Sequence, residues 1–327
     1  MGSKNSSESI NENFKGKDIV SLDQLNTQSL YKLFALTKKV KKKIATSKPN
    51  KALQGKIVTL IFYEPSSRTF ASFAAATKLL GGQTIEIQDP QHFSSVSKGE
   101  TLEDTIRVFE AYSHAIVLRH PVVGTAQKAA DAADFAPIIN AGDGIGEHPT
   151  QAMLDLFTIY EKFGKLDNLT GVLAGDLLNG RTIHSLIRGL ALFKKNKLFL
   201  LSPAKLKLTR DDFAKFSKRG VELIEIETEN EMPKNAHFWY WTRVQKERFE
   251  NIEEYEKVKN RFIVTGKLLK ERGNRNLIVM HPLPRVGEIL YEVDADPRAI
   301  YLTSQVRNGM YVRMALLALV LGREKYV

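Results

Sequence analysis

Short apolar runs of strand length alternate with longer helix-like segments along most of the chain. The first set of runs covers residues 57–63, 84–88, 115–118 and 137–140, with helical patterns near 69–80, 102–111 and 125–134. A second set covers residues 172–174, 198–202, 221–225, 236–240 and 277–280. Such alternation is typical of parallel βαβ units with helices on both faces of the sheet. The sequence therefore predicts an α/β fold with two doubly wound parallel-sheet domains.

The length of 327 residues also favours two domains, because it exceeds one ordinary hydrophobic core. Residues 1–18 are rich in Ser, Asn, Lys and Glu and lack an apolar core, so we expect a disordered tail and no secretory signal. A leading helix is expected over 20–46, and a helix over 148–163 would bridge the domains. We divide the rest of the chain into domains at 19–150 and 151–306 and a last helical segment at 307–327.

Charge and composition exclude several classes of protein. Lys and Arg outnumber Asp and Glu by 48 to 37, and residues 38–43 read Lys-Lys-Val-Lys-Lys-Lys. That run would form the solvated face of an amphipathic helix, and no aromatic side chains interleave it, so a nucleic-acid partner is not expected. No apolar run reaches transmembrane length. The absence of cysteine excludes disulfides and thiolate chemistry and fits a cytoplasmic protein.

A phosphate-binding segment follows the first apolar run. Residues 64–72 read Glu-Pro-Ser-Ser-Arg-Thr-Phe-Ala-Ser, where a strand should turn into a helix. Unpaired backbone N–H groups and the dipole at a helix start favour an anion, and Ser66, Ser67, Arg68 and Thr69 add donors and charge. Taken alone, the same residues also fit an ordinary helix cap.

Cations and donors follow other expected strands as well. They are Arg119 with His120, His148 with Gln151, Arg181 with Thr182, Arg243 with Gln245, and the segment 281–284. Because ligands of open parallel sheets bind beyond the carboxyl ends of the strands, we expect these residues to converge. The main alternative for a fold of this kind is a binding site for a dinucleotide cofactor. Gly142, Gly144 and Gly146 give the wrong glycine spacing for it, so a nucleotide cofactor is disfavoured.

The combined motifs resemble the catalytic chain of the aspartate carbamoyltransferase family. The stretches that carry the resemblance are FYEPSSRTFASF (62–73), SSVSKGETLEDT (94–105), VLRHP (117–121), HPTQAMLDLFTI (148–159), GDLLNGRTIHSL (175–186), WTRVQKERF (241–249), HPLPRVGEI (281–289) and NGMYVRMALLALVLG (308–322). The likeness runs from about residue 22 to residue 322. It implies that 19–150 binds carbamoyl phosphate, that 151–306 binds aspartate, and that 307–327 packs back on the first domain.

The resemblance implies a carbamoyl transfer that needs neither a cofactor nor a metal. Carbamoyl phosphate and the amine of L-aspartate would give N-carbamoyl-L-aspartate and phosphate, the committed step of pyrimidine (UMP) biosynthesis. Such a reaction depends on holding two anions together and neutralising charge in the transition state. No side chain stands out as the base for the attacking amine, and this step stays open.

Site residues follow from the resemblance, position by position. Ser66, Ser67, Arg68 and Thr69 would hold the phosphate, and Arg119 would span the phosphate and the carbonyl oxygen. His148 would donate to that oxygen with help from Thr69 and Arg119. Gln151 would accept from the carbamoyl NH2 group, together with main-chain carbonyls near Pro282 and Leu283. Two arginines suit the two carboxylates of aspartate, so Arg181 and Arg243 are expected there, with Thr182, Gln245 and Leu283 as neighbours.

The family pattern also implies a homotrimer with shared active sites. The loop that carries Lys98 would reach into the active site of a neighbouring subunit. There Lys98 would bind both carbamoyl phosphate and aspartate and take part in catalysis. A serine of the same loop would join it, either Ser94 or Ser95, and we assign Ser95. Regulatory chains and other pathway enzymes remain open as further partners.

Three positions depart from the pattern, and two alternative functions stay open. Phe70 stands where many relatives carry a second arginine, Ser67 replaces a more frequent threonine, and Trp241 is bulkier than usual. The first alternative is ornithine carbamoyltransferase, whose cysteine-containing motifs and Ser-Met-Gly loop are missing here. The second is a non-catalytic scaffold of the same fold, which would not need all of the cations named above.

Overall fold

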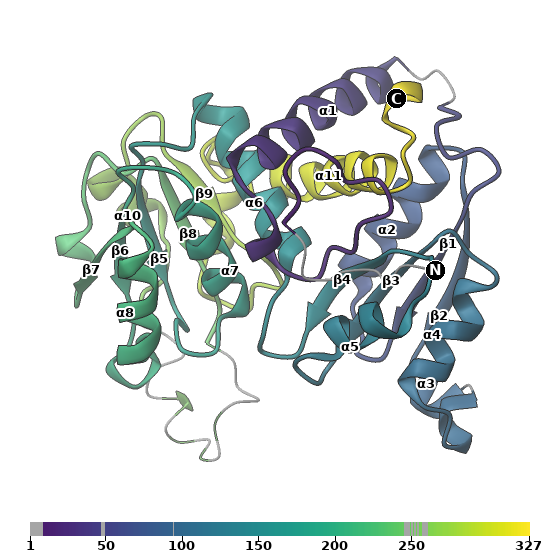
Figure 1. Cartoon of the computed structure of the whole chain (residues 1–327). Helices are drawn as coiled ribbons and strands as arrows, with labels where there is room; N and C mark the ends of the chain where they lie inside the picture. Colours follow the sequence, from purple (N-terminus) through teal and green to yellow (C-terminus); the bar gives the residue numbers. More distant parts are fainter. Residues whose placement is uncertain are drawn as a thin grey trace. The chain divides into compact units, whose positions relative to one another are not determined.

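The structure is a computed structural model of the whole chain. The structure describes residues 9–46, 50–93, 95–244, 249, 251, 253, 255–256 and 261–327. Contacts divide the chain into two compact units (Figure 1). Unit 1 comprises Met1–Phe157 and Arg307–Val327, and unit 2 comprises Thr158–Val306. Each unit is built on its own parallel sheet, which confirms the predicted fold class.

Unit 1 contains a four-stranded parallel sheet with the order β2-β1-β3-β4. Its strands are β1 (Ile57–Phe62), β2 (Gln83–Gln88), β3 (Ala115–His120) and β4 (Ile138–Asp143). The longer helices that lie wholly within its first segment, Met1–Phe157, are α1 (Thr27–Ala45), α2 (Ser67–Leu79), α4 (Leu102–Glu110) and α5 (Thr125–Ala132). After β2 the chain returns to the other side of β1 to form β3. The order of the strands thus reverses between β1 and β3.

The two faces of this sheet are covered by different helices. Side chains alternate between faces along a strand. Ile61 and Ile116 share a buried cluster with Ile106 of α4 and with the alanines of α5. Phe62, next to Ile61, packs edge-on against Phe70 of α2, with ring centroids 5.2 Å apart. The helix α2 therefore covers the face opposite to α4 and α5, and Phe70 is a core residue of this contact.

The N-terminal region is ordered where sequence composition predicts a disordered tail. The described part of the chain begins at residue 9, and Ile10 and Phe14 are each only 1% exposed. Ile10 also pairs with Leu25 through a backbone bridge. The prediction for 1–18 is therefore wrong for 9–18, because two buried apolar side chains anchor a segment that is polar on average. Residues 1–8 lie outside the described part.

The leading helix is preceded by a short 3-10 turn, η1 (Leu22–Gln24), which Ser21 caps. Asn26 then caps α1, whose buried stripe includes Leu30, Leu33 and Val40. This stripe confirms the amphipathic interpretation of the lysine-rich run.

The last long helix, α11 (Ser304–Val320), lies beside α1 (Figure 1). Lys41 of α1 donates to Asn308 and sits 5.9 Å from the ring centroid of Tyr311. These contacts confirm that the C-terminal helix packs on the first domain.

Unit 2 contains a five-stranded parallel sheet with the order β7-β6-β5-β8-β9. Its strands are β5 (Thr170–Ala174), β6 (Lys197–Leu201), β7 (Glu222–Ile226), β8 (Phe238–Trp241) and β9 (Ile278–Met280). The helices among its described residues include α7 (Arg181–Leu190), α8 (Arg210–Lys218) and α10 (Gly266–Arg272), while α6 (Pro149–Phe163) runs across the division of the chain. The strand order reverses between β5 and β8.

Several short elements complete the description. They are α3 (Pro90–Phe93), η2 (Ser95–Lys98), η3 (Ala204–Leu206), η4 (Glu229–Glu231), η6 (Tyr291–Ala295) and η7 (Glu324–Tyr326). Within the described ranges, no helix is long and apolar enough to cross a bilayer.

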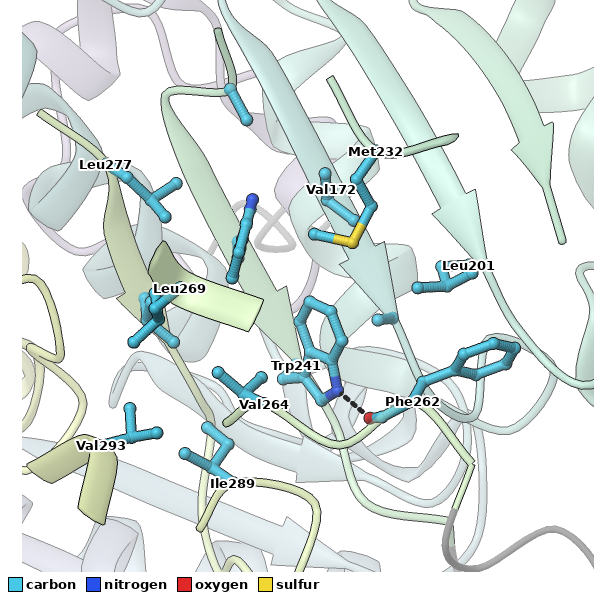
Figure 2. Close-up of a cluster of buried hydrophobic side chains, with 14 of the residues drawn as sticks. Val172, Leu201, Met232, Trp241, Phe262, Val264, Leu269, Leu277, Ile289 and Val293 are labelled. Carbon is cyan, nitrogen blue, oxygen red and sulfur yellow. Dashed lines mark hydrogen bonds between the residues drawn. The ribbon is translucent and has the colours of Figure 1, made fainter. Parts of the chain in front are cut away.

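The end of β8 is anchored in the core of unit 2. Trp241 is fully buried among apolar side chains that include Met232, Val264 and Leu269 (Figure 2). Its indole N–H donates to the backbone oxygen of Phe262 at 2.5 Å. The bulky residue at this departure from the family pattern therefore fixes the strand end that leads into Thr242 and Arg243.

Candidate functional site

The candidate residues of unit 1 gather where its strand order reverses. Phe62 of β1 is paired in register with Arg119 of β3, and the N–H of Tyr63 donates to the carbonyl of Arg119 at 2.9 Å. The segment 64–69, which continues from β1, therefore starts beside Arg119. In open α/β sheets this reversal is the point at which ligands bind.

The start of α2 is available to an anion. Ser66 is the N-cap residue, but its side chain makes no capping hydrogen bond. Its hydroxyl is thus not used for the ordinary structural role that the sequence left open. Ser66 is half-buried and Ser67 and Arg68 are exposed. Partial burial lowers the pKa of Arg68, yet an arginine keeps its charge at neutral pH.

Arg119 is only 7% exposed and is held from two sides. Its Nη2 lies 2.7 Å from a carboxylate oxygen of Glu64, and Nη1 donates to the carbonyl of Ala141 at 3.3 Å. Gly142 makes room for the guanidinium, because a Cβ there would lie 2.8 Å from Nη1 and the backbone φ is +130°. The cation is therefore fixed at the strand ends with a carboxylate as its present counterion.

Thr69 and His148 meet inside unit 1. Their Oγ1 and Nε2 atoms lie 3.5 Å apart, and the side chains are 7% and 4% exposed. His148 immediately precedes α6, whereas Thr69 lies in the first turn of α2. Two predicted donors to one carbonyl oxygen are thus neighbours, although they lie far apart in the sequence.

A buried polar network supports both helix starts. Arg313 of α11 donates to Ser72 Oγ at 2.7 Å and to Thr150 Oγ1 at 3.4 Å. Ser72 in turn donates to the carbonyl of Thr69 at 3.0 Å. On α6, Gln151 donates to Asp155. The helix that follows the phosphate segment and the helix that follows His148 are therefore joined through one arginine.

The candidate residues of unit 2 also gather at the reversal of strand order. Ala174 at the end of β5 pairs with Trp241 at the end of β8. Gly175 turns the chain away from β5 with φ +108°, and a Cβ there would lie 2.1 Å from the carbonyl oxygen of Thr242. This close approach brings together the two segments that lead to Arg181 and Arg243.

Arg181 begins α7, and Arg243 follows β8; both side chains are partly exposed. Thr182 follows Arg181 in α7 and is also partly exposed. Two guanidinium groups after adjacent strands suit a ligand with two carboxylates. Gln245 lies outside the described residues.

The segment after β9 has a fixed backbone. His281 Nδ1 accepts from the N–H of Leu283 at 2.7 Å, and His281 Nε2 lies 2.7 Å from Glu288. Leu283 adopts φ +58° and is followed by a cis peptide bond to Pro284. Since Nδ1 accepts, Nε2 carries the proton that it donates to Glu288. This pair holds the backbone at Pro282 and Leu283, both of which are partly exposed.

The loop expected to serve a neighbouring subunit is described only in part. Ser95 and Lys98 belong to η2, the side chain of Lys98 is exposed, and Ser94 lies outside the described residues. Their role in another subunit stays a prediction. Among the described residues there is no group of three or more His, Cys, Asp or Glu side chains that could hold a metal ion.

Sequence reasoning did not single out four residues that the structure connects to the candidate site: Glu64, Asp155, Glu288 and Arg313. For Asp155 a signal existed, because Gln and Asp four residues apart on a helix face can hydrogen-bond. For the other three, the partner is remote or separated by an irregular loop, and nothing local identifies it.

Comparisons with known proteins cover nearly the whole chain. A family model described as "Aspartate/ornithine carbamoyltransferase, carbamoyl-P binding domain" matches residues 17–161. A second, "Aspartate/ornithine carbamoyltransferase, Asp/Orn binding domain", matches residues 167–320.

Individual relatives agree with these family models. The chain is 46% identical to "Multifunctional protein pyr1-3" of Dictyostelium discoideum over 94% of its own length, but it spans only 14% of that protein. It is 44% identical to "Aspartate carbamoyltransferase, chloroplastic" of Arabidopsis thaliana, covering 94% of this chain and 78% of the relative. A solved structure of aspartate transcarbamoylase from Trypanosoma cruzi, in complex with carbamoyl phosphate and aspartate, matches with a TM-score of 0.86 and 38% identity. The match covers 96% of this chain and 99% of that one.

Proposed function

Because the chain belongs to the aspartate and ornithine carbamoyltransferase family, we propose that it transfers the carbamoyl group of carbamoyl phosphate to the amine of L-aspartate. The products are N-carbamoyl-L-aspartate and phosphate, and the reaction is the committed step of pyrimidine biosynthesis. The observation that carries the proposal is the position of the candidate cations at the reversal of strand order in each unit. The named relative from Arabidopsis and the liganded structure from Trypanosoma cruzi support it.

In unit 1 we assign the first substrate to the start of α2 and to Arg119. The N–H groups at the helix start, with Ser66, Ser67 and Arg68, bind the phosphate. Arg119 exchanges its present contact with Glu64 for one with the substrate, since an anion of higher charge competes with the carboxylate. Thr69 and His148 donate to the carbonyl oxygen as negative charge develops on it.

The bond changes are those of acyl transfer. The aspartate nitrogen forms a bond to the carbamoyl carbon, the bond from that carbon to the phosphate oxygen breaks, and the phosphate departs with the electron pair. The amine loses a proton in the process, and the departing phosphate, whose negative charge increases as the bond breaks, can accept it. Positioning and charge stabilisation by these side chains are sufficient for chemistry of this kind.

In unit 2 we assign the aspartate carboxylates to Arg181 and Arg243, with Thr182, Gln245 and Leu283 as neighbours. Each guanidinium can donate two parallel hydrogen bonds to one carboxylate. Ornithine, which carries an amine on its side chain, would meet two cations there. The printed name of the Arabidopsis relative, an aspartate carbamoyltransferase, agrees with this choice.

We further propose a homotrimer in which Ser95 and Lys98 complete the site of a neighbouring subunit. The exposure of Lys98 is compatible with such a contact. The Dictyostelium relative is a multifunctional protein, so association with other enzymes of the pathway is a natural extension. A cytoplasmic location stays a prediction, and the Arabidopsis relative is named as chloroplastic.

An assay with aspartate and ornithine in parallel tests the function. Wild type should form N-carbamoyl-aspartate and no citrulline. Arg68→Ala should reduce the rate by about two to three orders of magnitude, because it removes a charged group from the phosphate site. Arg210→Ala, an exposed arginine at the start of α8, is the control and should keep full activity. Product formation from ornithine alone would overturn the assignment.

A further inference from the structure

Gln151 and Asp155 lie one turn apart on α6 and form a two-pronged contact. The amide nitrogen of Gln151 donates to both carboxylate oxygens of Asp155, each at 3.1 Å. Asp155 is completely buried, whereas Gln151 is only partly buried. An ionised carboxylate can only accept hydrogen bonds. The amide nitrogen must therefore face Asp155, and the amide oxygen of Gln151 points away from it.

Arg313 supplies the positive charge that a buried carboxylate needs. Its side chain is 4% exposed, donates to Ser72 and Thr150, and lies 5.1 Å from the ring centroid of Phe73. Burial lowers the pKa of Arg313 to about 10, although the charge of Asp155 acts in the opposite direction. Arg313 is thus protonated at neutral pH, and its charge favours the ionised form of Asp155.

We propose that Asp155 is a positioning residue that makes the enzyme select a carbamoyl group over other acyl groups. It does so by fixing Gln151 as a hydrogen-bond acceptor. The inference rests on the proposed function, in which Gln151 faces the carbamoyl NH2 group. That NH2 group can only donate, because its lone pair is delocalised into the carbonyl. An amide oxygen presented by Gln151 matches it, and an amide nitrogen would not.

The alternative orientation of Gln151 explains why selection needs a second residue. Rotating a glutamine amide by half a turn exchanges its oxygen and its nitrogen with little change in shape. A donor would then face the donor of the substrate, and both groups would lose a partner in a partly buried site. Sites built to pair a substrate N–H discriminate strongly against analogues that lack it. Acetyl phosphate is such an analogue, with a methyl group in place of the NH2.

The experiment compares the two acyl phosphates on wild type and Asp155→Asn. Dissociation constants are measured by calorimetry, or as inhibition constants for acetyl phosphate in the transfer assay. Wild type should prefer carbamoyl phosphate. An asparagine offers one acceptor group and one donor group in place of two acceptors, so it holds Gln151 less firmly in the required orientation. Asp155→Asn should therefore reduce the preference for carbamoyl phosphate over acetyl phosphate roughly tenfold, chiefly by weakening the binding of carbamoyl phosphate.

A matched control exists on α5. Gln127 donates to Asp131 at 2.7 Å with the same spacing of four residues, but on an exposed face. Asp131→Asn should leave the preference between the two acyl phosphates unchanged.

A double-mutant cycle separates positioning from general damage. In a Gln151→Met background, Asp155→Asn should produce no further loss of preference, since the residue through which it acts is gone. Removing only Asp155 leaves Arg313 as a buried charge, which can compromise folding. The paired variant Asp155→Asn with Arg313→Met removes both charges and should show the same narrowed preference.

The outcomes distinguish the inference from the function on which it rests. A narrowed preference that disappears in the Gln151→Met background supports the inference. If wild type is active but the Asp155 variants bind both acyl phosphates equally more weakly, or bind both as wild type does, the inference is overturned and the proposed function stands. A wild type that forms no N-carbamoyl-aspartate overturns the proposed function, and the inference falls with it.

Discussion

Arg119 and Glu64 form an ion pair at the carboxyl ends of neighbouring strands, with 2.7 Å between Nη2 and a carboxylate oxygen. Arg119 stands near the end of β3, and Glu64 follows β1. The carboxylate occupies Nη2 of the guanidinium group that the substrate is expected to use. An acidic side chain inside a phosphate site is unfavourable for binding unless the contact is exchanged when the ligand arrives.

Replacing Glu64 should therefore change the affinity of the free enzyme for phosphate. Glu64→Gln removes a competing negative charge, and we expect inorganic phosphate to bind about three- to tenfold more tightly, as for a partly screened ion pair. Calorimetric titration in low salt measures the effect. Weaker binding in the variant would mean that Glu64 orients Arg119 for phosphate instead of competing with it.

A lysine in place of Arg119 should not preserve activity. Arg119→Lys keeps the charge but loses the planar group that donates two parallel hydrogen bonds. We expect kcat/KM for carbamoyl phosphate to fall by about two orders of magnitude or more. Steady-state kinetics check this, with the exposed Arg107→Lys on α4 as the control. A loss of less than about threefold would remove Arg119 from the reaction.

Arg243 should affect only the second substrate. Because Arg243→Gln removes a charge-assisted contact in unit 2, KM for aspartate should rise about ten- to a hundredfold. The phosphate-binding residues of unit 1 are untouched, so the dissociation constant of inorganic phosphate should stay the same. Lys267→Gln, an exposed position in the same unit, serves as the control. Equal loss of phosphate binding would contradict the assignment to aspartate.

The buried contact between His281 and Glu288 predicts a dependence of stability on pH. Burial raises the pKa of Glu288, but the hydrogen bonds from His281 and from backbone N–H groups outweigh it and leave the pKa below its ordinary value. A lowered pKa stabilises the fold above the unfolded value of 4.5, and this stabilisation is lost as the pH falls through the folded value. Wild type should therefore lose unfolding free energy in acid.

The variant Glu288→Gln tests this dependence. It should be less stable than wild type at pH 7 by about 1–3 kcal/mol, because it replaces the charged acceptor of the buried hydrogen bond from His281 with a neutral amide. Its stability should also change less between pH 6 and pH 3, as measured by denaturant unfolding. Glu271→Gln, at an exposed ion pair, should behave like wild type. If the unfolding free energies of wild type and Glu288→Gln fell in parallel as the pH decreased, the Glu288 carboxylate would not be the cause of the pH dependence.

If active sites are shared between subunits, mixing two inactive variants should restore part of the activity. Lys98→Ala and Arg68→Ala should each be nearly inactive. In trimers formed from equal amounts of both, about a quarter of the sites would combine an intact Arg68 with an intact Lys98 from the neighbour. Activity should therefore rise towards that fraction after subunit exchange. No recovery, with exchange demonstrated by mass spectrometry, would argue that each site is built from one chain.

The sheets could be predicted because their strands carry a local signal. Most are short apolar runs between polar turns. The predicted runs 57–63 and 115–118 lie within two residues of the ends of β1 (57–62) and β3 (115–120). Asn308 and Gly309 are poor helix formers, yet both lie inside α11, which begins at Ser304. Both are buried, and packing overrides their local preference. Polar composition similarly concealed Ile10 and Phe14.

The supporting contacts of the site could not be predicted. The hydroxyl and arginine pattern at the start of α2, residues 66–69, indicates a phosphate, since the chemistry requires those residue types in one place. Arg313 gives no such indication, because a charged residue in an apolar helix has a partner that only the fold reveals. The same holds for the choice of Glu64 as a counterion to Arg119.

The last long helix of the chain carries Arg313, the residue that joins the start of α2 to the start of α6. Unit 1 is thus assembled from the first and the final stretches of the polypeptide, with all of unit 2 in between. During synthesis on the ribosome, the second unit can complete its sheet while the first still lacks a central cation. A nascent chain should accordingly acquire its affinity for phosphate late, only after α11 has emerged and docked.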